Sequence, residues 1–113
     1  MNRSVLQIGQ NLLLALVLTL SLSASMRAAD SATATLYKAK CASCHGMDGK
    51  GTAMGEAMGV SDFASPKVQK ETDQELIEIT AKGKNDMPEY GSTLKDSPIK
   101  ALVAYSRKLA KKK

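Results

Sequence analysis

Two cysteines and one histidine stand together in the chain, and their types and spacing suggest a specific chemistry. Cys41, Ala42, Ser43, Cys44 and His45 form the pattern Cys-x-x-Cys-His. The two thiols lie about one helical turn apart, so both can form thioether bonds to one edge of a porphyrin. The adjacent imidazole then lies beneath the iron as an axial ligand. The motif therefore predicts covalent attachment of one haem c.

Other chemistry is compatible with parts of this motif. A disulfide between Cys41 and Cys44 would suit an exported protein, and Cys-x-x-Cys also marks thioredoxin-like redox sites. However, no alternation of strands and helices of the thioredoxin kind follows the motif. A structural zinc site normally needs four protein ligands, whereas the chain has two cysteines and one histidine. Haem attachment is the interpretation that also agrees with the N-terminal sequence.

The ligand on the other side of the iron decides whether the site is closed or open to reactants. The chain contains no second histidine, which excludes a second imidazole. A methionine thioether is the remaining good ligand, because soft sulfur stabilises ferrous iron. Met87 follows turn-forming residues and precedes Pro88, so we expect it on an extended segment between two helices. His45 and Met87 are therefore the predicted iron ligands.

The other methionines leave alternatives. Met54 and Met58 lie in the glycine-rich loop that follows the motif, and either could replace Met87 as the ligand. An open iron, available for oxygen or peroxide chemistry, is the third alternative. Met47 lies too close to His45 in the sequence to reach the opposite side.

Residues 1–29 have the features of a secretion signal. Arg3 lies in a short charged start, an apolar run covers 12–22, and small residues follow. Cleavage after Ser25 suits the small-residue rule, whereas cleavage after Ala29 would leave an arginine at an unfavourable position. We therefore expect export to the periplasm or another compartment outside the cytoplasm, where haem attachment of this type takes place.

An uncleaved membrane anchor is the alternative to a secretion signal. The stretch Val5–Ala24 approaches the length of a membrane span. Gln7, Gln10 and Asn11 interrupt its apolar character, so we predict that the mature protein has no membrane span.

The remaining residues, 30–113, read as one small all-α domain, because neither an internal repeat nor strand-like alternation occurs in them. The whole chain has one Phe, three Tyr and no Trp, so it lacks large aromatic side chains for a core. A buried porphyrin would supply the missing apolar centre. We expect the loop rich in glycine over 46–59 to wrap closely around the edge of the ring; a flexible surface loop is the alternative.

Local signals predict four helices in this domain. The first covers about 31–41, and Tyr37 shares a face with the first cysteine. Ser65 with Pro66, and Thr72 with Glu75, are helix-start patterns, and Gly83 is a stop signal. In the last helix Ser97 is the predicted cap and Pro98 lies in the opening turn. The predicted inward-facing residues of the last helix are Leu102, Tyr105 and Leu109.

The charge of the chain argues against nucleic acid as a partner. The formal net charge is +5, and no basic stripe is interleaved with aromatic residues. Lys111–Lys113 is most simply a solvated tail, with docking of an acidic partner as the alternative.

Three segments together resemble a bacterial class I cytochrome c. They are the run from Tyr37 to Gly51 around the haem motif, the Gly-Lys-Asn-Asp-Met-Pro-Glu-Tyr segment around Met87, and Leu102–Tyr105. The chain looks most similar to the short soluble members and to the cytochrome domains of respiratory oxidases. The resemblance covers nearly all of 30–113.

The resemblance implies a fold with crossing N- and C-terminal helices and about four short helices around one covalent haem. It places Tyr37 and Tyr105 at or beside the crossing and implies ligation by His45 and Met87. Many relatives have a proline in the loop after the motif, near the carbonyl that accepts the histidine N–H. Thr52–Met54 contains no proline, so this acceptor is not assigned.

These observations predict a one-electron carrier, not an enzyme, that works as a monomer between redox proteins through a small transient interface. Four lysines could surround the exposed ring edge and steer an acidic partner. The alternatives are a cytochrome subunit of a larger membrane complex and a haem enzyme or gas sensor with a displaceable methionine. The four lysines are Lys38, Lys40, Lys50 and Lys84.

Overall fold

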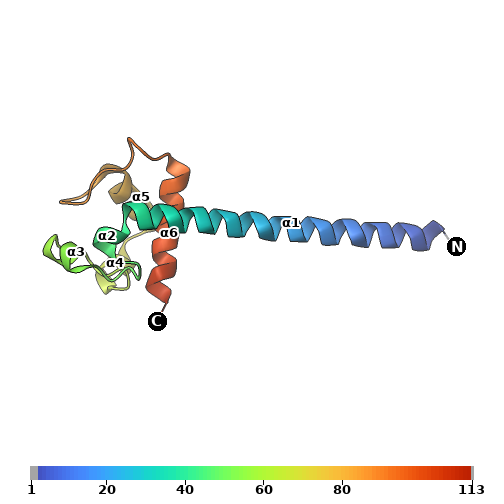
Figure 1. Ribbon diagram of the computed structural model, residues 1–113, viewed down its shortest axis with the longest axis horizontal. Helices are drawn as coiled ribbons and strands as arrows, with labels where there is room; N and C mark the ends of the chain where they lie inside the picture. The colour runs from blue at the N-terminus through green and yellow to red at the C-terminus, as the bar shows by residue number, and fades with distance from the viewer. Residues whose placement is uncertain (1–2, 113) are drawn as a thin grey trace. The chain divides into compact units, whose positions relative to one another are not determined.

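The described part of the chain is all-α. A computed structural model describes residues 3–112, so the first two residues of the predicted signal and Lys113 of the predicted tail lie outside it. Within this range no β-strand is formed, and the β-type pairing is an isolated antiparallel bridge between Lys84 and Met87. The predicted fold class is therefore confirmed. The helices are α1 (Arg3–Lys40), α2 (Ala42–His45), α3 (Ala53–Ala57), α4 (Pro66–Lys70), α5 (Asp73–Lys82) and α6 (Asp96–Lys111) (Figure 1).

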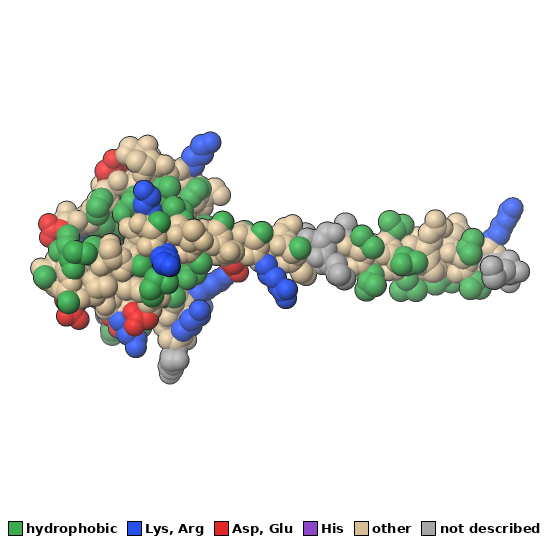
Figure 2. Space-filling view, in the orientation of Figure 1, with side chains coloured by type: hydrophobic (Ala, Val, Ile, Leu, Met, Phe, Trp, Pro, Cys, Tyr) green, Lys and Arg blue, Asp and Glu red, His purple; other side chains and the backbone are tan. Residues whose placement is uncertain are grey.

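The chain divides into two units, and the boundary lies between Ala32 and Thr33. In the first unit the large apolar side chains of α1 are exposed from Val5 to Val17 and at Met26, as Figure 2 shows in green. The predicted helix start at Ser31 is wrong, because the helix is already formed at Arg3. The sequence before Ser31 is rich in helix-forming leucine and alanine and contains no proline. Among the described residues, we find no helix with the length and apolarity needed to span a membrane.

The second unit is built around the contact between the end of α1 and α6. Figure 1 shows α6 crossing the last turns of α1. Tyr37, Leu102 and Leu109 are buried together in this crossing. The rings of Tyr37 and Tyr105 are tilted by 49°, with centroids 5.1 Å apart, which is a favourable geometry for an aromatic pair. The predicted crossing of the terminal helices and the role of both tyrosines in it are confirmed.

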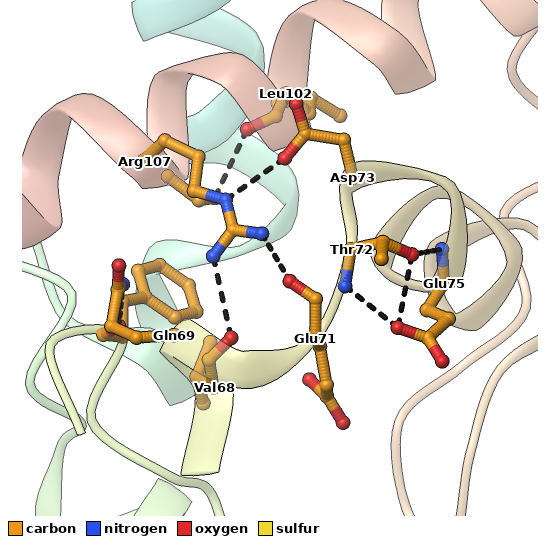
Figure 3. Close-up of polar contacts among 10 residues, drawn as sticks. Val68, Gln69, Glu71, Thr72, Asp73, Glu75, Leu102 and Arg107 are labelled. Atoms are coloured by element: carbon orange, nitrogen blue, oxygen red, sulfur yellow. Dashed lines mark hydrogen bonds and ion pairs between the residues drawn. The ribbon is translucent and has the colours of Figure 1, made fainter. Parts of the chain in front are cut away.

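The short helices α4 and α5 begin at the predicted caps. Ser65 accepts a hydrogen bond from the Val68 N–H, and Pro66 occupies the first turn. Thr72 and Glu75 form a capping box in which each side chain accepts a bond from the backbone N–H of the other (Figure 3). Gly83 then caps the C-terminus of α5, with φ 75°. These local signals were sufficient because a cap involves residues only a few positions apart.

Arg107 of α6 holds the connection between α4 and α5. Its guanidinium donates to the carbonyls of Val68 (3.3 Å) and Glu71 (2.5 Å) and to the carboxylate of Asp73 (3.0 Å) (Figure 3). The Arg107 side chain is mostly buried, at 21% exposure. Because charge-assisted bonds are stronger than neutral ones, this residue fixes the α4–α5 connection against α6.

Two details differ from the prediction. The cap of α6 is Lys95, which makes no side-chain bond, and not Ser97. Pro98 explains the difference, since proline is tolerated throughout the first turn, where N–H groups have no intrahelical partner. In addition, α2 and α3 were not predicted. Like α4, they are too short to show a periodic pattern, and they lack the Ser-Pro start by which α4 was recognised.

The capping box of α5 generates a prediction about pH. The Thr72 backbone N–H, followed by its hydroxyl, holds the pKa of the Glu75 carboxyl below its ordinary value of 4.5. The bond therefore stabilises fully above that value and is lost as the pH falls through the lower pKa of the folded state. We expect Glu75→Gln to lower the thermal midpoint at pH 7 and the difference from the native chain to shrink below pH 4.5.

Glu78→Gln is the control for this experiment. Glu78 lies on the same helix and makes an exposed ion pair with Lys82 at 3.7 Å, which contributes little. Curves for Glu75→Gln and the native chain that stay parallel from pH 7 to pH 3 would contradict the prediction.

Candidate haem site

The four predicted site residues line one cavity of the second unit. Cys41, Cys44 and His45 reach it from α2 and its first flanking residue, and Met87 reaches it from the segment between α5 and α6. The structure thus brings together residues that are more than forty positions apart in the sequence. The rest of the lining is largely apolar and includes Val60, Phe63, Leu76, Ile79, Leu102 and Val103.

The motif itself is a short helix. The N–H groups of Cys44 and His45 donate to the Cys41 carbonyl at 3.2 and 2.9 Å. Both cysteines are free and half-buried. Burial raises the pKa of the Cys41 thiol to about 11, whereas thioredoxin-like redox sites depend on a lowered thiol pKa. Among the described side chains, no group of three or more His, Cys, Asp or Glu could hold a metal ion such as zinc.

Tyr37 fixes the end of the motif. Its buried hydroxyl donates to the Gly46 carbonyl at 2.7 Å. Burial, and to a smaller extent the nearby Cys41, raises the pKa of this phenol well above its usual range. The hydroxyl therefore remains protonated and can donate. Gly46 has φ 76°, and a Cβ there would press on Asp48 and Gly51. The crossing of α1 and α6 is thereby connected to the haem motif.

The glycine-rich loop packs closely against the motif. The Thr52 hydroxyl donates to the Ser43 carbonyl at 2.7 Å, and the Thr52 N–H donates to the Cys44 carbonyl at 3.0 Å. Thr52 also caps α3 by accepting a bond from the Gly55 N–H. A Cβ at Gly55 would overlap the Cys44 carbonyl oxygen. The loop is thus a close support of the motif, with glycine where the two backbones meet.

The His45 imidazole is oriented by an aromatic ring. It stacks on Phe63, with centroids 4.8 Å apart and planes 27° from parallel. Phe63 is anchored by its N–H to the Gly49 carbonyl at 2.9 Å and by its carbonyl, which accepts from Gln69 at 2.7 Å. No local pattern predicted a role for Phe63, although it is the single phenylalanine of the chain.

The second ring nitrogen of His45 lacks the expected acceptor. Its Nδ1 is buried and has no hydrogen-bond partner among the described residues. The acceptor that the sequence left unassigned is thus not found among the residues that the structure describes. Loss of solvent on burial lowers the pKa of His45, which favours the neutral imidazole that binds metals.

Met87 is held at the end of a tight turn. Its N–H donates to the Lys84 carbonyl at 3.0 Å, and its carbonyl accepts from the Lys84 N–H at 3.3 Å. Asn85 within the turn has φ 52°, a left-handed value that asparagine tolerates. Gly83 lies so close to Met87 and Pro88 that a Cβ would collide with their backbones. The predicted turn-rich, non-helical segment is confirmed.

Exposure separates the methionines. Met87 is half-buried and lines the cavity, whereas Met54 is 54% exposed and is not part of the lining. Met58 also lines the cavity but is 39% exposed. Met47 is exposed on the loop. These positions favour Met87 over the other thioethers as an axial ligand.

Not all of the predicted lysines lie at the cavity. Lys40 and Lys84 line it, together with Lys67, which was not predicted. Lys38 and Lys50 are exposed but are not among the lining residues, so their expected place at the ring edge is not supported. Lys67 follows Pro66 on α4, and only the folding of α4 against the cavity brings it there.

The residues present fit a covalent haem. Two free thiols one turn apart, a half-buried imidazole and a half-buried thioether face the same apolar cavity. This donor set is the one that attaches and ligates the iron in haem c.

Comparison with known proteins also supports a covalent haem. Residues 28–105 match the family model for subunit III of cbb3-type cytochrome c oxidase. A solved structure of the KustC0563 c-type cytochrome shows 35% identity and a TM-score of 0.63, covering 67% of this chain and 94% of that one. A tyrosine-to-phenylalanine variant of KustC0563 shows 33% identity and the same TM-score, with coverages of 68% and 96%. No curated protein sequence matches the chain.

The close approach of Gly55 to the motif gives a prediction. Gly55→Ala must displace either α3 or the Cys44 backbone, and we expect a loss of about 3 kcal/mol in unfolding free energy, the upper end for overpacking. Denaturant titration of the purified chain, followed by haem absorbance, measures this loss.

Gly59→Ala is the matched control. Gly59 has φ 76° but open space around its Cα, so alanine costs only the left-handed conformation, about 1 kcal/mol. Equal losses for the two variants would show that the contact with Cys44 carries no special weight.

Proposed function

The chain belongs to the cytochrome c family that includes the cbb3-type oxidase subunit III domain, and on that premise we propose a carrier with His45 and Met87 as its iron ligands. It is a c-type cytochrome with covalently bound haem c. The proposal assigns Cys41 and Cys44 to the thioether bonds. The observation that carries it is the convergence of these four side chains on one apolar cavity.

Each residue has a separate task in this proposal. The bound haem supplies an iron that takes up and releases one electron. Cys41 and Cys44 anchor the group, so it stays with the protein through many cycles. His45, which is oriented by Phe63, and Met87, which is held in its turn, would remain the two iron ligands in both oxidation states. A fixed ligand set minimises the rearrangement that accompanies each transfer.

The residues of the cavity wall would influence the reduction potential of the iron. Leu76, Ile79, Leu102 and Val103 line the site and would keep water away from a bound haem. A low-dielectric wall disfavours the additional positive charge of the ferric state. A thioether ligand acts in the same direction, since it favours ferrous iron. Together these residues would raise the reduction potential.

The surroundings of the cavity are suited to brief contacts with other redox proteins. Lys40, Lys67 and Lys84 lie at its lining together with Glu71 and Asp86, and the excess of positive charge there would steer an acidic partner. We propose that the mature protein, residues 30–113, acts as a monomer in the periplasm after removal of a signal within 1–29. Its donor and acceptor would dock through a small transient interface.

A second candidate function is a cytochrome subunit of a larger membrane complex. The matched family model favours it, because that model describes an oxidase subunit. Fractionation of the native protein separates the two: recovery in the periplasmic fraction supports the free carrier, and constant recovery with one membrane assembly supports the subunit.

Met87→Ala tests the ligand assignment. We expect covalent haem to be retained, the sulfur-to-iron charge-transfer band of the ferric form to disappear, and the potential to fall by on the order of 0.1 V. The ferrous variant should also bind carbon monoxide rapidly. Redox titration with absorbance spectra records the first three results on one sample.

Met54→Ala and Met58→Ala are the controls, and we expect both to keep the band and the potential of the native protein. If Met87→Ala kept the band and Met58→Ala lost it, the axial ligand would be Met58. Rapid binding of carbon monoxide by the unmodified ferrous protein would instead indicate an open or weakly closed iron.

A further inference from the structure

The segment that carries Met87 has few buried contacts of its own. Asn85, Asp86, Pro88 and Glu89 are all exposed. The Lys84–Met87 turn orders the segment only locally. Something outside the turn must therefore keep it beside the cavity.

Tyr90, three residues after Met87, anchors the far end of this segment. Its N–H donates to the Thr80 carbonyl at 3.1 Å, and the next N–H, of Gly91, donates to Ala81 at 2.9 Å. Its own carbonyl accepts from the Leu94 N–H at 2.8 Å. The backbone of Tyr90 is thus fixed on α5 and on the turn that leads toward α6.

The side chain of Tyr90 reaches a different part of the fold. Its hydroxyl donates to the carbonyl of Lys40 at 2.8 Å, across fifty positions of sequence. Lys40 is the last residue of α1 and immediately precedes Cys41. The last carbonyls of a helix have no partner within the helix, so this one is available to a tyrosine.

The ring of Tyr90 also lines the cavity, together with Cys41 and Met87. Burial, followed by the neighbouring Cys41 and Cys44, raises the pKa of the Tyr90 phenol. The hydroxyl therefore stays protonated and able to donate throughout the neutral range. Tyr90 thus belongs to the segment that carries Met87, and its side chain contacts the residue that precedes Cys41.

We propose that Tyr90 is a positioning residue whose bond to the Lys40 carbonyl holds the Met87 segment closed against the end of α1. Its role toward the iron rests on the ligand assignment proposed above. With the bond made, the Met87 sulfur stays at the cavity when the charge of the site changes. Without it, the exposed segment opens more often and a competing ligand can enter.

The test is Tyr90→Phe in the full chain with haem attached. Phenylalanine keeps the ring in the cavity wall and removes only the hydroxyl. We expect external imidazole to bind the ferric variant about five- to tenfold more tightly, the change that one lost hydrogen bond permits. Hydrogen exchange in peptides covering 84–91 should also be faster.

Tyr105→Phe is the matched control. Tyr105 packs on Tyr37 in the helix crossing and does not line the cavity. We expect this variant to match the native protein in imidazole affinity and in exchange over 84–91. A general effect of losing a tyrosine hydroxyl would appear in both variants.

The outcomes separate this inference from the ligand assignment. Unchanged exchange over 84–91 in Tyr90→Phe would overturn the positioning role, whatever ligand the iron has. Faster exchange together with tighter imidazole binding would support it. If the native protein lacked the sulfur-to-iron band, Met87 ligation would fail by itself, and exchange over 84–91 would still decide whether Tyr90 closes the segment.

Discussion

The second unit depends on side chains that donate hydrogen bonds to backbone carbonyls around one apolar cavity. Tyr37 holds Gly46, Thr52 holds Ser43, and Tyr90 holds Lys40. Arg107 and Gln69 do the same on the α4 side. These bonds connect the loops and helix ends that line the cavity, where backbone carbonyls need partners from outside their own helix.

This arrangement explains how so short a chain can present two sides of a haem site. The attachment side is local, since Cys41, Cys44 and His45 are neighbours on one short helix. The methionine side is remote and comes from the segment between α5 and α6. Helix α6 joins them, because it packs on α1 through Tyr105 and on the α4–α5 connection through Arg107. A covalently attached apolar group would complete the centre that the chain's few aromatic residues cannot form.

The environment of His45 is the clearest departure from the pattern expected of this family. A metal-bound histidine normally donates its second N–H to an acceptor, which fixes the ring and increases its basicity. Here the buried Nδ1 has no such partner among the residues that the structure describes, and the ring of Phe63 stacks on the imidazole. Stacking restricts the tilt of an imidazole without adding electron density to it. The segment after the motif thus supports the His45 imidazole through a ring contact and not through a hydrogen bond to its Nδ1.

The sequence by itself determined what depends on neighbours in the chain: the haem motif, the caps at Ser65 and Thr72, and a turn that carries Met87. It did not determine the start of α1, the cap of α6 or the helices α2 and α3, because their signals are weak or compete with proline chemistry. The tertiary structure decided which residues surround the motif. Phe63, Tyr90 and Arg107 act through contacts over eighteen to fifty positions, and no local pattern encodes a contact between segments that only folding brings together.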